Sequence, residues 1–286
     1  GKTTLLDVLA QRKSVGKITG EIRMNGAPID PEILARVSGY VEQQNIHVET
    51  ETVEEALVMS ASLRLSFPVD SDNSTHTITR RDRLEHVAWV MNVLSLSSIR
   101  GALISELSLE QKKRLTIGVE LAANPSLLWL DEPTSGLDSM AALSVMRAVK
   151  RISEQGVAVI CTLHQPSELL FSWSTHLLLL APGGKMVFFG ESSDNNHSAK
   201  LFFSQFHSQP DNESDAEYFL DCCSSKEQNH NGHSITEAFI ASEDFSDLQL
   251  LLKDQIPKKE TQKLPWYRNV FRSYNIQKNE NPNDEW

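Results

Sequence analysis

The fold is decided by the stretch Leu127-Leu128-Trp129-Leu130-Asp131-Glu132-Pro133-Thr134-Ser135-Gly136-Leu137-Asp138. A short apolar run is followed there by two adjacent carboxylates and a small, tight turn. At the end of a buried strand, Asp131 can hold a magnesium ion, and Glu132 can orient or deprotonate an attacking water. The alternative is that the two carboxylates only cap the next helix, which would leave the turn after them unexplained.

The first residues of the chain, Gly1-Lys2-Thr3-Thr4, match the closing half of a phosphate-binding loop. Such a loop needs main-chain N–H groups at a helix N-terminus, a lysine for the outer phosphates and a hydroxyl for magnesium. Four residues alone are more simply an ordinary helix start. Together with the two carboxylates of the opening stretch, they predict a site for ATP and Mg²⁺.

Two further polar side chains follow strand-like runs: Gln43 after residues 37–41, and His164 after residues 157–163. We expect the sheet to place His164 beside the second carboxylate, where it can donate a hydrogen bond to the γ-phosphate. Gln43 can reach Mg²⁺ or the attacking water, with Gln44 as the alternative for this role. A lone histidine after a strand is more often structural, but the order of these motifs favours a functional one.

Strands alternate with helices along most of the chain, which predicts an α/β domain with a mostly parallel sheet. The expected strands are 37–41, 127–130, 157–163, 177–180 and 186–189, with a hairpin at 18–29 around Asn25-Gly26. The expected helices are 1–14, 52–65, 80–94, 108–122 and 140–155, then 198–208 and 235–256. Polar loops are expected at 70–79, 191–197 and 224–234.

The bulk composition is that of a globular protein, with 40% hydrophobic and 23% charged residues among 286. The net charge of -11 argues against a nucleic-acid partner, because such partners usually meet a basic face. The three cysteines Cys161, Cys222 and Cys223 imply no disulfide framework and fit a reducing, cytosolic compartment. The longest apolar runs are too short to span a bilayer, so we expect any membrane part to lie outside this chain.

An ordered set of motifs resembles the nucleotide-binding domain of ABC transporters over roughly residues 1–210. The set comprises Gly1-Lys2-Thr3-Thr4, Gly39-Tyr40-Val41-Glu42-Gln43, Leu107-Ser108-Leu109-Glu110-Gln111, the stretch from Leu130 to Asp138, and Leu163-His164-Gln165-Pro166-Ser167. The stretches 114–121 and 177–190 are more specifically similar to the G-type, pleiotropic drug resistance group. The resemblance implies a RecA-like P-loop NTPase core with a helical subdomain at about 50–125. It also implies that residues 211–286 form a linker or appendage toward a transmembrane domain.

The same resemblance implies roles for the phosphate loop and the metal site. Gly1 would be the last glycine of the loop, Lys2 would contact the β- and γ-phosphates, and Thr4 would contact the α-phosphate. Thr3 and Asp131 would hold Mg²⁺. The family loop reads GxxxxGKT, so its first glycine, the first strand and an aromatic residue for adenine would precede Gly1. We expect the chain to bind ATP poorly without them.

The resemblance also implies roles for the remaining motifs. Gln43 would be the Q-loop residue and a further contact to Mg²⁺. Glu132 would be the catalytic base and His164 the switch histidine. Asp138 would lie in the D-loop, at the interface with a second nucleotide-binding domain.

The signature loop departs from the family pattern LSGGQ. Ser108 is retained, but Leu109 and Glu110 replace both glycines. A Cβ at each position hinders close approach of the main chain to a phosphate, and Glu110 adds a negative charge there. We therefore expect this loop to serve a weak or silent site, while the other motifs act with an intact signature loop from a partner domain. This asymmetry resembles the second nucleotide-binding domain of pleiotropic drug resistance transporters.

These expectations combine into a membrane-associated exporter domain on the cytoplasmic face. ATP would be sandwiched between two such domains, and hydrolysis would drive attached transmembrane domains to move a hydrophobic compound outward. One alternative is a soluble ABC protein of translation or DNA repair, against which the acidic balance, the stretch 114–121 and the absence of long heptads count. Another is a non-catalytic fragment from an incomplete gene model.

Overall fold

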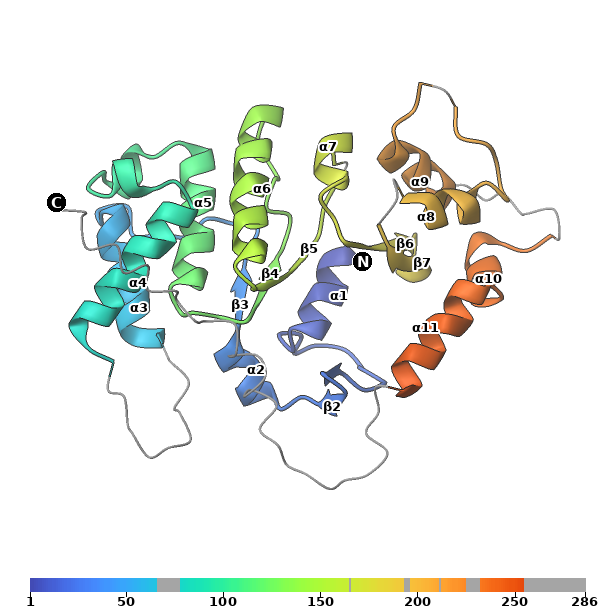
Figure 1. The fold of residues 1–286 in the computed structure, drawn as a ribbon, viewed down its shortest axis with the longest axis horizontal. Coiled ribbons are helices and arrows are strands. Elements are labelled where there is room, and N and C mark those ends of the chain that lie inside the picture. The colour runs from blue at the N-terminus through green and yellow to red at the C-terminus, as the bar shows by residue number, and fades with distance from the viewer. Residues whose placement is uncertain (66–77, 165, 193–195, 211, 225–231, 255–286) are drawn as a thin grey trace, which may run out of the picture.

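The structure is a computed structural model. It describes residues 1–286 except 66–77, 165, 193–195, 211, 225–231 and 255–286 (Figure 1). The strands are β1 (Arg23–Met24), β2 (Ala27–Pro28), β3 (Ser38–Val41), β4 (Leu127–Leu130), β5 (Ala158–Cys161), β6 (His176–Ala181) and β7 (Lys185–Glu191). The α-helices are α1 (Lys2–Leu9), α2 (Pro31–Val37), α3 (Val53–Arg64), α4 (Arg80–Val93), α5 (Leu109–Leu121), α6 (Ser139–Glu154), α7 (Glu168–Phe171), α8 (His197–Phe203), α9 (Asp215–Ser224), α10 (Ile235–Ile240) and α11 (Glu243–Asp254). Two short 3₁₀ turns are η1 (Ser97–Ile99) and η2 (Ile104–Glu106).

The central sheet consists of β3, β4 and β5, which run parallel in that order. The middle strand β4 is buried along its whole length, as its unbroken apolar sequence predicts. Leu128 and Leu130 face a core that includes buried residues of α5 and α6. The alternate residues Leu127 and Trp129 pack on the other face against α1 and α2. This helix–sheet–helix arrangement confirms the α/β class.

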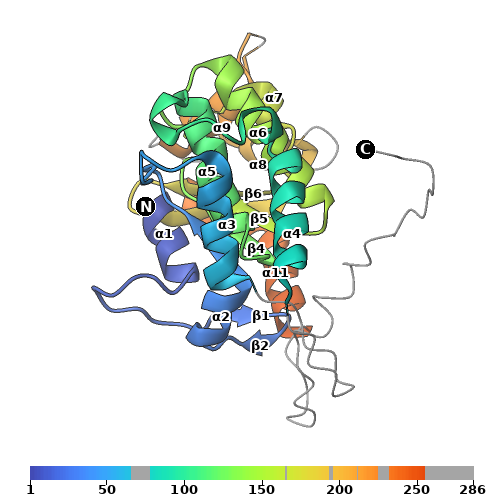
Figure 2. The same cartoon turned by 90° about the vertical axis from the view of Figure 1, so that its left-hand side faces the viewer.

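The helices α3, α4 and α5 pack together at one side of the sheet, where Figures 1 and 2 show them side by side. Each begins at a hydroxyl cap, because Thr52, Thr79 and Ser108 accept hydrogen bonds from main-chain N–H groups in the first turn. Thr52 and Glu55 form a full capping box at the start of α3. The loop expected at 70–79 lies largely outside the described residues.

A second apolar cluster lies at the other end of the molecule, at the right of Figure 1. The hairpin of β6 and β7 packs there against α8, α9 and α10 through buried phenylalanines: Phe171, Phe188, Phe202, Phe203, Phe219 and Phe239. Helices after residue 210 thus pack in one cluster with the hairpin before it. The short helix α7 joins this cluster to the first, because Leu170 belongs to the first core and Phe171 to the second.

The structure contains elements that the sequence pattern did not predict. Helix α2 begins at the Asp30-Pro31 pair, with Asp30 accepting hydrogen bonds from the next N–H groups, and it ends after only seven residues. Helices α7 and α9 are also additional. The hairpin at Asn25-Gly26 is present as expected, with both residues at positive φ. The loop expected at 224–234 lies mostly outside the described residues. In the part of the chain that the structure describes, every helix is too short or too polar to span a lipid bilayer.

Candidate nucleotide site

Asp131 lies at the carboxyl ends of the three parallel strands, where two threonine hydroxyls contact it. Asp131, directly after β4, is 5% exposed, and its N–H donates to the carbonyl of Val41 at 3.0 Å. Its Oδ1 accepts hydrogen bonds from the hydroxyls of Thr3 at 3.1 Å and Thr162 at 2.7 Å. The contact between Thr3 and Asp131 joins the first turn of α1 to the end of β4, across 128 positions of sequence.

Glu132 and Gln43 also meet, although 89 positions separate them in the sequence. The Gln43 amide Nε2 donates to Glu132 Oε2 at 3.0 Å and to Ser135 Oγ at 3.2 Å. The main chain of Glu132 has φ +45°, a left-handed conformation that is strained for a residue with a side chain. Its N–H donates to the hydroxyl of Thr162 at 2.9 Å, which stabilises that conformation.

Thr162 and Lys113 contact this site but were not expected there. Thr162 follows β5, and its hydroxyl serves both Asp131 and Glu132. Lys113 of α5 is 1% exposed, and its ammonium donates to the main-chain carbonyl of Gln43 at 2.7 Å. Burial lowers the pKa of Lys113, and the negative charge of Asp131 offsets part of that effect. The expected strand 157–163 placed Thr162 inside the strand, whereas β5 ends one residue before it, and nothing local pointed to Lys113.

The N-terminus of α1 lies at the same edge of the sheet. Helix α1 begins at Lys2 with Gly1 as its cap, and its first-turn residues Thr3 and Thr4 are exposed. The first N–H groups of a helix carry partial positive charge and bind phosphate oxygens. Lys2 and Thr4 are therefore available to an anion, while Thr3 is already directed at Asp131.

Asp138 and Ser108 both cap helices. Asp138 Oδ1 accepts from the N–H groups of Met140 and Ala141 at 3.0 and 2.9 Å, so it begins α6. The alternative that Asp131 and Glu132 cap this helix is therefore wrong. Ser108 forms a capping box with Gln111 at the start of α5.

The signature loop lies close to the turn that follows the carboxylates. A Cβ added at Gly136 would lie 3.7 Å from Leu109 Cδ2, which is ordinary contact distance. Glu110 pairs with Arg114 at 3.3 Å, one helical turn later, and the Arg114 side chain is 11% exposed. The negative charge that Glu110 adds is thus partly balanced within the chain.

His164 lies in an exposed position after β5, and the described residues include no hydrogen-bond partner for it. Its expected placement beside Glu132 stays a prediction. The described residues also include no group of three or more His, Cys, Asp or Glu side chains suited to a metal. The oxygens of Thr3 and Asp131 lie together and suit Mg²⁺, which proteins commonly hold with one or two carboxylates together with substrate phosphates. The Gln43 amide also carries an oxygen of a kind that can bind Mg²⁺.

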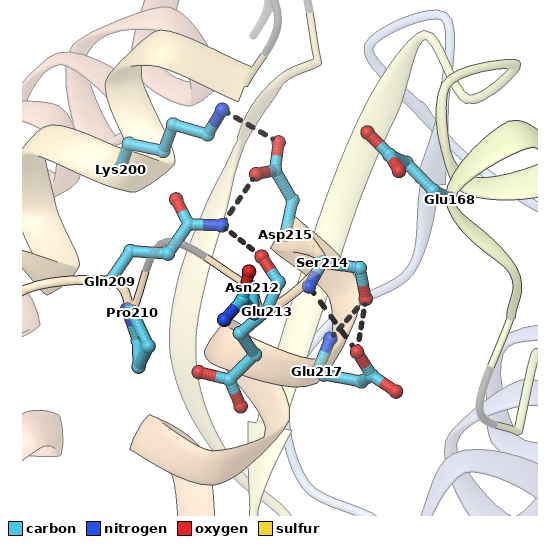
Figure 3. A pocket seen from close by; sticks show the side chains of 9 residues that line it. All are labelled: Glu168, Lys200, Gln209, Pro210, Asn212, Glu213, Ser214, Asp215 and Glu217. Atoms are coloured by element: carbon cyan, nitrogen blue, oxygen red, sulfur yellow. Dashed lines mark hydrogen bonds and ion pairs between the residues drawn. The ribbon is translucent and has the colours of Figure 1, made fainter.

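A polar pocket of about 530 Å³ lies away from these residues, between α7, α8 and the start of α9 (Figure 3). Its most buried acid, Asp215, pairs with Lys200 at 2.9 Å and accepts from Asn196 and Gln209, each at 3.0 Å. Burial tends to raise the pKa of Asp215, but these partners outweigh that effect and lower it. The interactions account for the charge without a ligand, so the pocket is explained as a structural network.

The geometry at the strand ends defines a class of protein: one with the P-loop NTPase fold. A helix begins there with a lysine and a hydroxyl, a buried aspartate accepts from that hydroxyl, and a glutamate follows within reach of a glutamine. A family model described as "ABC transporter" matches residues 1–135 of the chain.

Known proteins support the same class. The chain is 42% identical over 247 residues to ABC transporter G family member 30 of Arabidopsis thaliana. The aligned region covers 84% of this chain and 17% of that protein. It is 44% identical over 226 residues to ABC multidrug transporter G of Aspergillus fumigatus, covering 77% of this chain and 16% of that protein. A solved nucleotide-free ATP-binding cassette from an ABC transporter has the same fold, with a TM-score of 0.56 at 20% identity over 70% of this chain and 79% of that chain.

The chain belongs to the ABC transporter family, as an ATP-binding domain. Its relatives are G-family and multidrug transporters, which agrees with the G-type resemblance of its motifs. It spans less than a fifth of their length, at 17% and 16% for the two relatives described.

Proposed function

We propose that this chain is the ATP-hydrolysing domain of an ABC exporter, in which ATP hydrolysis drives hydrophobic compounds across a membrane. The observation that carries the proposal is the pair of contacts Thr3–Asp131 and Gln43–Glu132 at one edge of the sheet. They join three separate motifs into one arrangement suited to a nucleotide and a divalent cation.

Each residue then has a role in hydrolysis. Lys2 and the N–H groups that begin α1 bind the phosphates, with Thr4 at the α-phosphate. Thr3, Asp131 and Gln43 would hold Mg²⁺, which would offset the negative charge of the phosphates.

The catalytic step belongs to the glutamate. Glu132 accepts the proton of the attacking water, and Gln43 orients the Glu132 carboxylate through the hydrogen bond at 3.0 Å. His164 donates a hydrogen bond to the γ-phosphate. The strained main chain of Glu132 fixes where its side chain starts, which favours one geometry for the base.

The proposal includes two kinds of partner. A second nucleotide-binding domain with an intact signature loop supplies the opposite wall of the site, because Leu109 and Glu110 bring side chains where this loop would approach a phosphate. Asp138 and the turn before it contact that domain. Transmembrane domains carry the transported compound, and the nucleotide-binding pair lies on the cytoplasmic face.

The decisive experiment is Glu132→Gln in the complete protein that contains this chain. The amide keeps the shape of the side chain but cannot accept a proton at neutral pH, so ATP hydrolysis should fall by about a hundredfold or more while ATP still binds. Hydrolysis and binding of a fluorescent ATP analogue are measured side by side. The matched control is Glu154→Gln at the exposed end of α6, which should behave as wild type. Unchanged hydrolysis in Glu132→Gln would remove this residue from the mechanism.

A further inference from the structure

Lys113 is a charged side chain in the interior of the protein. It is 1% exposed, and its ammonium donates a 2.7 Å hydrogen bond to the carbonyl of Gln43, which lies 70 positions earlier in the sequence. Among the described residues, no carboxylate lies within ion-pair distance of this ammonium. Its neighbour Lys112 differs, because it forms an ion pair at 3.0 Å with the largely exposed Glu49.

Packing alone does not explain a lysine at this position. Moving an ammonium out of water is costly unless hydrogen bonds or opposite charges compensate. Among the residues that the structure describes, one carbonyl and the nearby charge of Asp131 compensate Lys113. A methionine would fill a similar volume without this cost, so the charge has a use other than filling space.

The hydrogen bond from Lys113 fixes the main chain of Gln43, whose side chain reaches the proposed base Glu132. Gln43 is exposed and follows β3, so its own surroundings restrain it little. Lys113 holds its carbonyl, while its amide donates to Glu132 and Ser135 at 3.0 and 3.2 Å. Gln43 is therefore held at its main chain from α5 and at its side chain from the end of β4.

We propose that Lys113 is a positioning residue for ATP hydrolysis, which holds the main chain of Gln43 so that the amide reaches Glu132. The inference rests on the proposed function, because Gln43 and Glu132 act there in hydrolysis. It adds a connection within the chain, since Lys113 lies on the helix that begins at Ser108. A displacement of the first turns of α5 then moves the carbonyl of Gln43 and the orientation of the base.

The test compares Lys113→Met with Lys112→Met in the complete protein, with kcat and KM for ATP measured separately. Misplacing a group that orients the base lowers kcat, so Lys113→Met should reduce kcat by about tenfold or more, with KM changed by less than about threefold. Lys112→Met makes the same chemical change at a surface ion pair and should keep both constants near wild type. Unchanged kcat in Lys113→Met would overturn the inference.

A double-mutant cycle separates positioning from a general structural role. If Lys113 acts through Gln43, its loss has no further effect once the Gln43 side chain is gone. The double variant Gln43→Ala, Lys113→Met should therefore match Gln43→Ala in kcat within about twofold. Losses that multiply would show that Lys113 acts elsewhere and would overturn the inference.

Two further variants keep every outcome informative. Lys113→Gln retains a donor for the carbonyl without the charge, and it should recover part of the kcat that methionine loses. If Lys113→Met does not fold, Lys113→Gln replaces it in the double-mutant cycle. The double variant with Gln43→Ala should then again match Gln43→Ala in kcat within about twofold. Glu132→Gln is measured in parallel: if it hydrolyses ATP normally, the proposed function fails. If it is inactive while Lys113→Met and Lys113→Gln are normal, only the present inference fails.

Discussion

Two hydrogen bonds meet at the hydroxyl of Thr162, just after β5. The hydroxyl donates to Asp131 Oδ1 at 2.7 Å and accepts from the N–H of Glu132 at 2.9 Å. One small side chain thus fixes the carboxylate of the first acid and the main chain of the second. The second of these bonds matters because Glu132 has a left-handed main chain at φ +45°, which needs support from its surroundings.

Replacing Thr162 by valine tests this arrangement, because valine has the same shape without the hydroxyl. The buried Asp131 loses a donor and the N–H of Glu132 loses its acceptor, so the free energy of unfolding should fall by about 1–3 kcal/mol. ATP hydrolysis should fall more steeply than ATP binding, because the base is no longer fixed. Urea unfolding and kcat measure the two effects. Thr162→Ser retains the hydroxyl, so a serine variant as impaired as valine would contradict the explanation.

At the scale of elements, α5 is the helix that connects the most parts of the site. It begins at Ser108, contributes Lys113 in its second turn, and packs against β3 at its far end. The approach is close at Gly39, where an added Cβ would lie 2.8 Å from Leu128 Cδ2 and 3.1 Å from Glu120 Cβ. Glycine is required there by space rather than by main-chain conformation.

Gly39→Ala should therefore push α5 away from the sheet. Overpacking of this kind costs about 1–3 kcal/mol of stability, and the shift should also loosen the contact of Lys113 with Gln43. Thermal or urea unfolding gives the first effect and kcat the second. The control is Gly101→Ala, at an exposed glycine with nothing within 4 Å of an added Cβ. Equal stabilities of the two variants would show that α5 has room to adjust.

At the scale of the whole molecule, two half-buried histidines predict how stability depends on pH. Burial lowers the pKa of both His47 and His86 below the ordinary value of 6.5. The folded protein therefore protonates these rings less readily than the unfolded chain, which takes up protons below about pH 6.5. The stability they support is therefore complete above that pH and is lost as pH falls through the folded-state pKa values.

The expected result is a urea midpoint that decreases between pH 7.5 and pH 5.5. The double variant His47→Gln, His86→Gln should show a smaller decrease, because glutamine can still hydrogen-bond but does not titrate. His176→Gln, at an exposed position on β6, controls for the substitution itself. A double variant with the same pH dependence as wild type would assign the effect to other groups.

Sequence reasoning predicted what depends on local pattern and on the order of strands. The apolar run before Asp131 predicted a buried parallel strand, and its neighbours in the sheet brought Gln43 to Glu132. Short elements such as α9 were missed because ten residues give little periodicity. Lys113 was missed for a different reason: its contact with Gln43 depends on how a helix lies across the end of the sheet, which pattern and spacing do not specify.

The neighbouring residues Leu170 and Phe171 of α7 belong to different apolar clusters. Loosening either cluster moves the same helical turn, so neither can open far while the other keeps its packing. Cooperativity follows: we expect one unfolding transition rather than two. Residues after 210, although remote from the nucleotide site, then contribute to the temperature at which that site is lost.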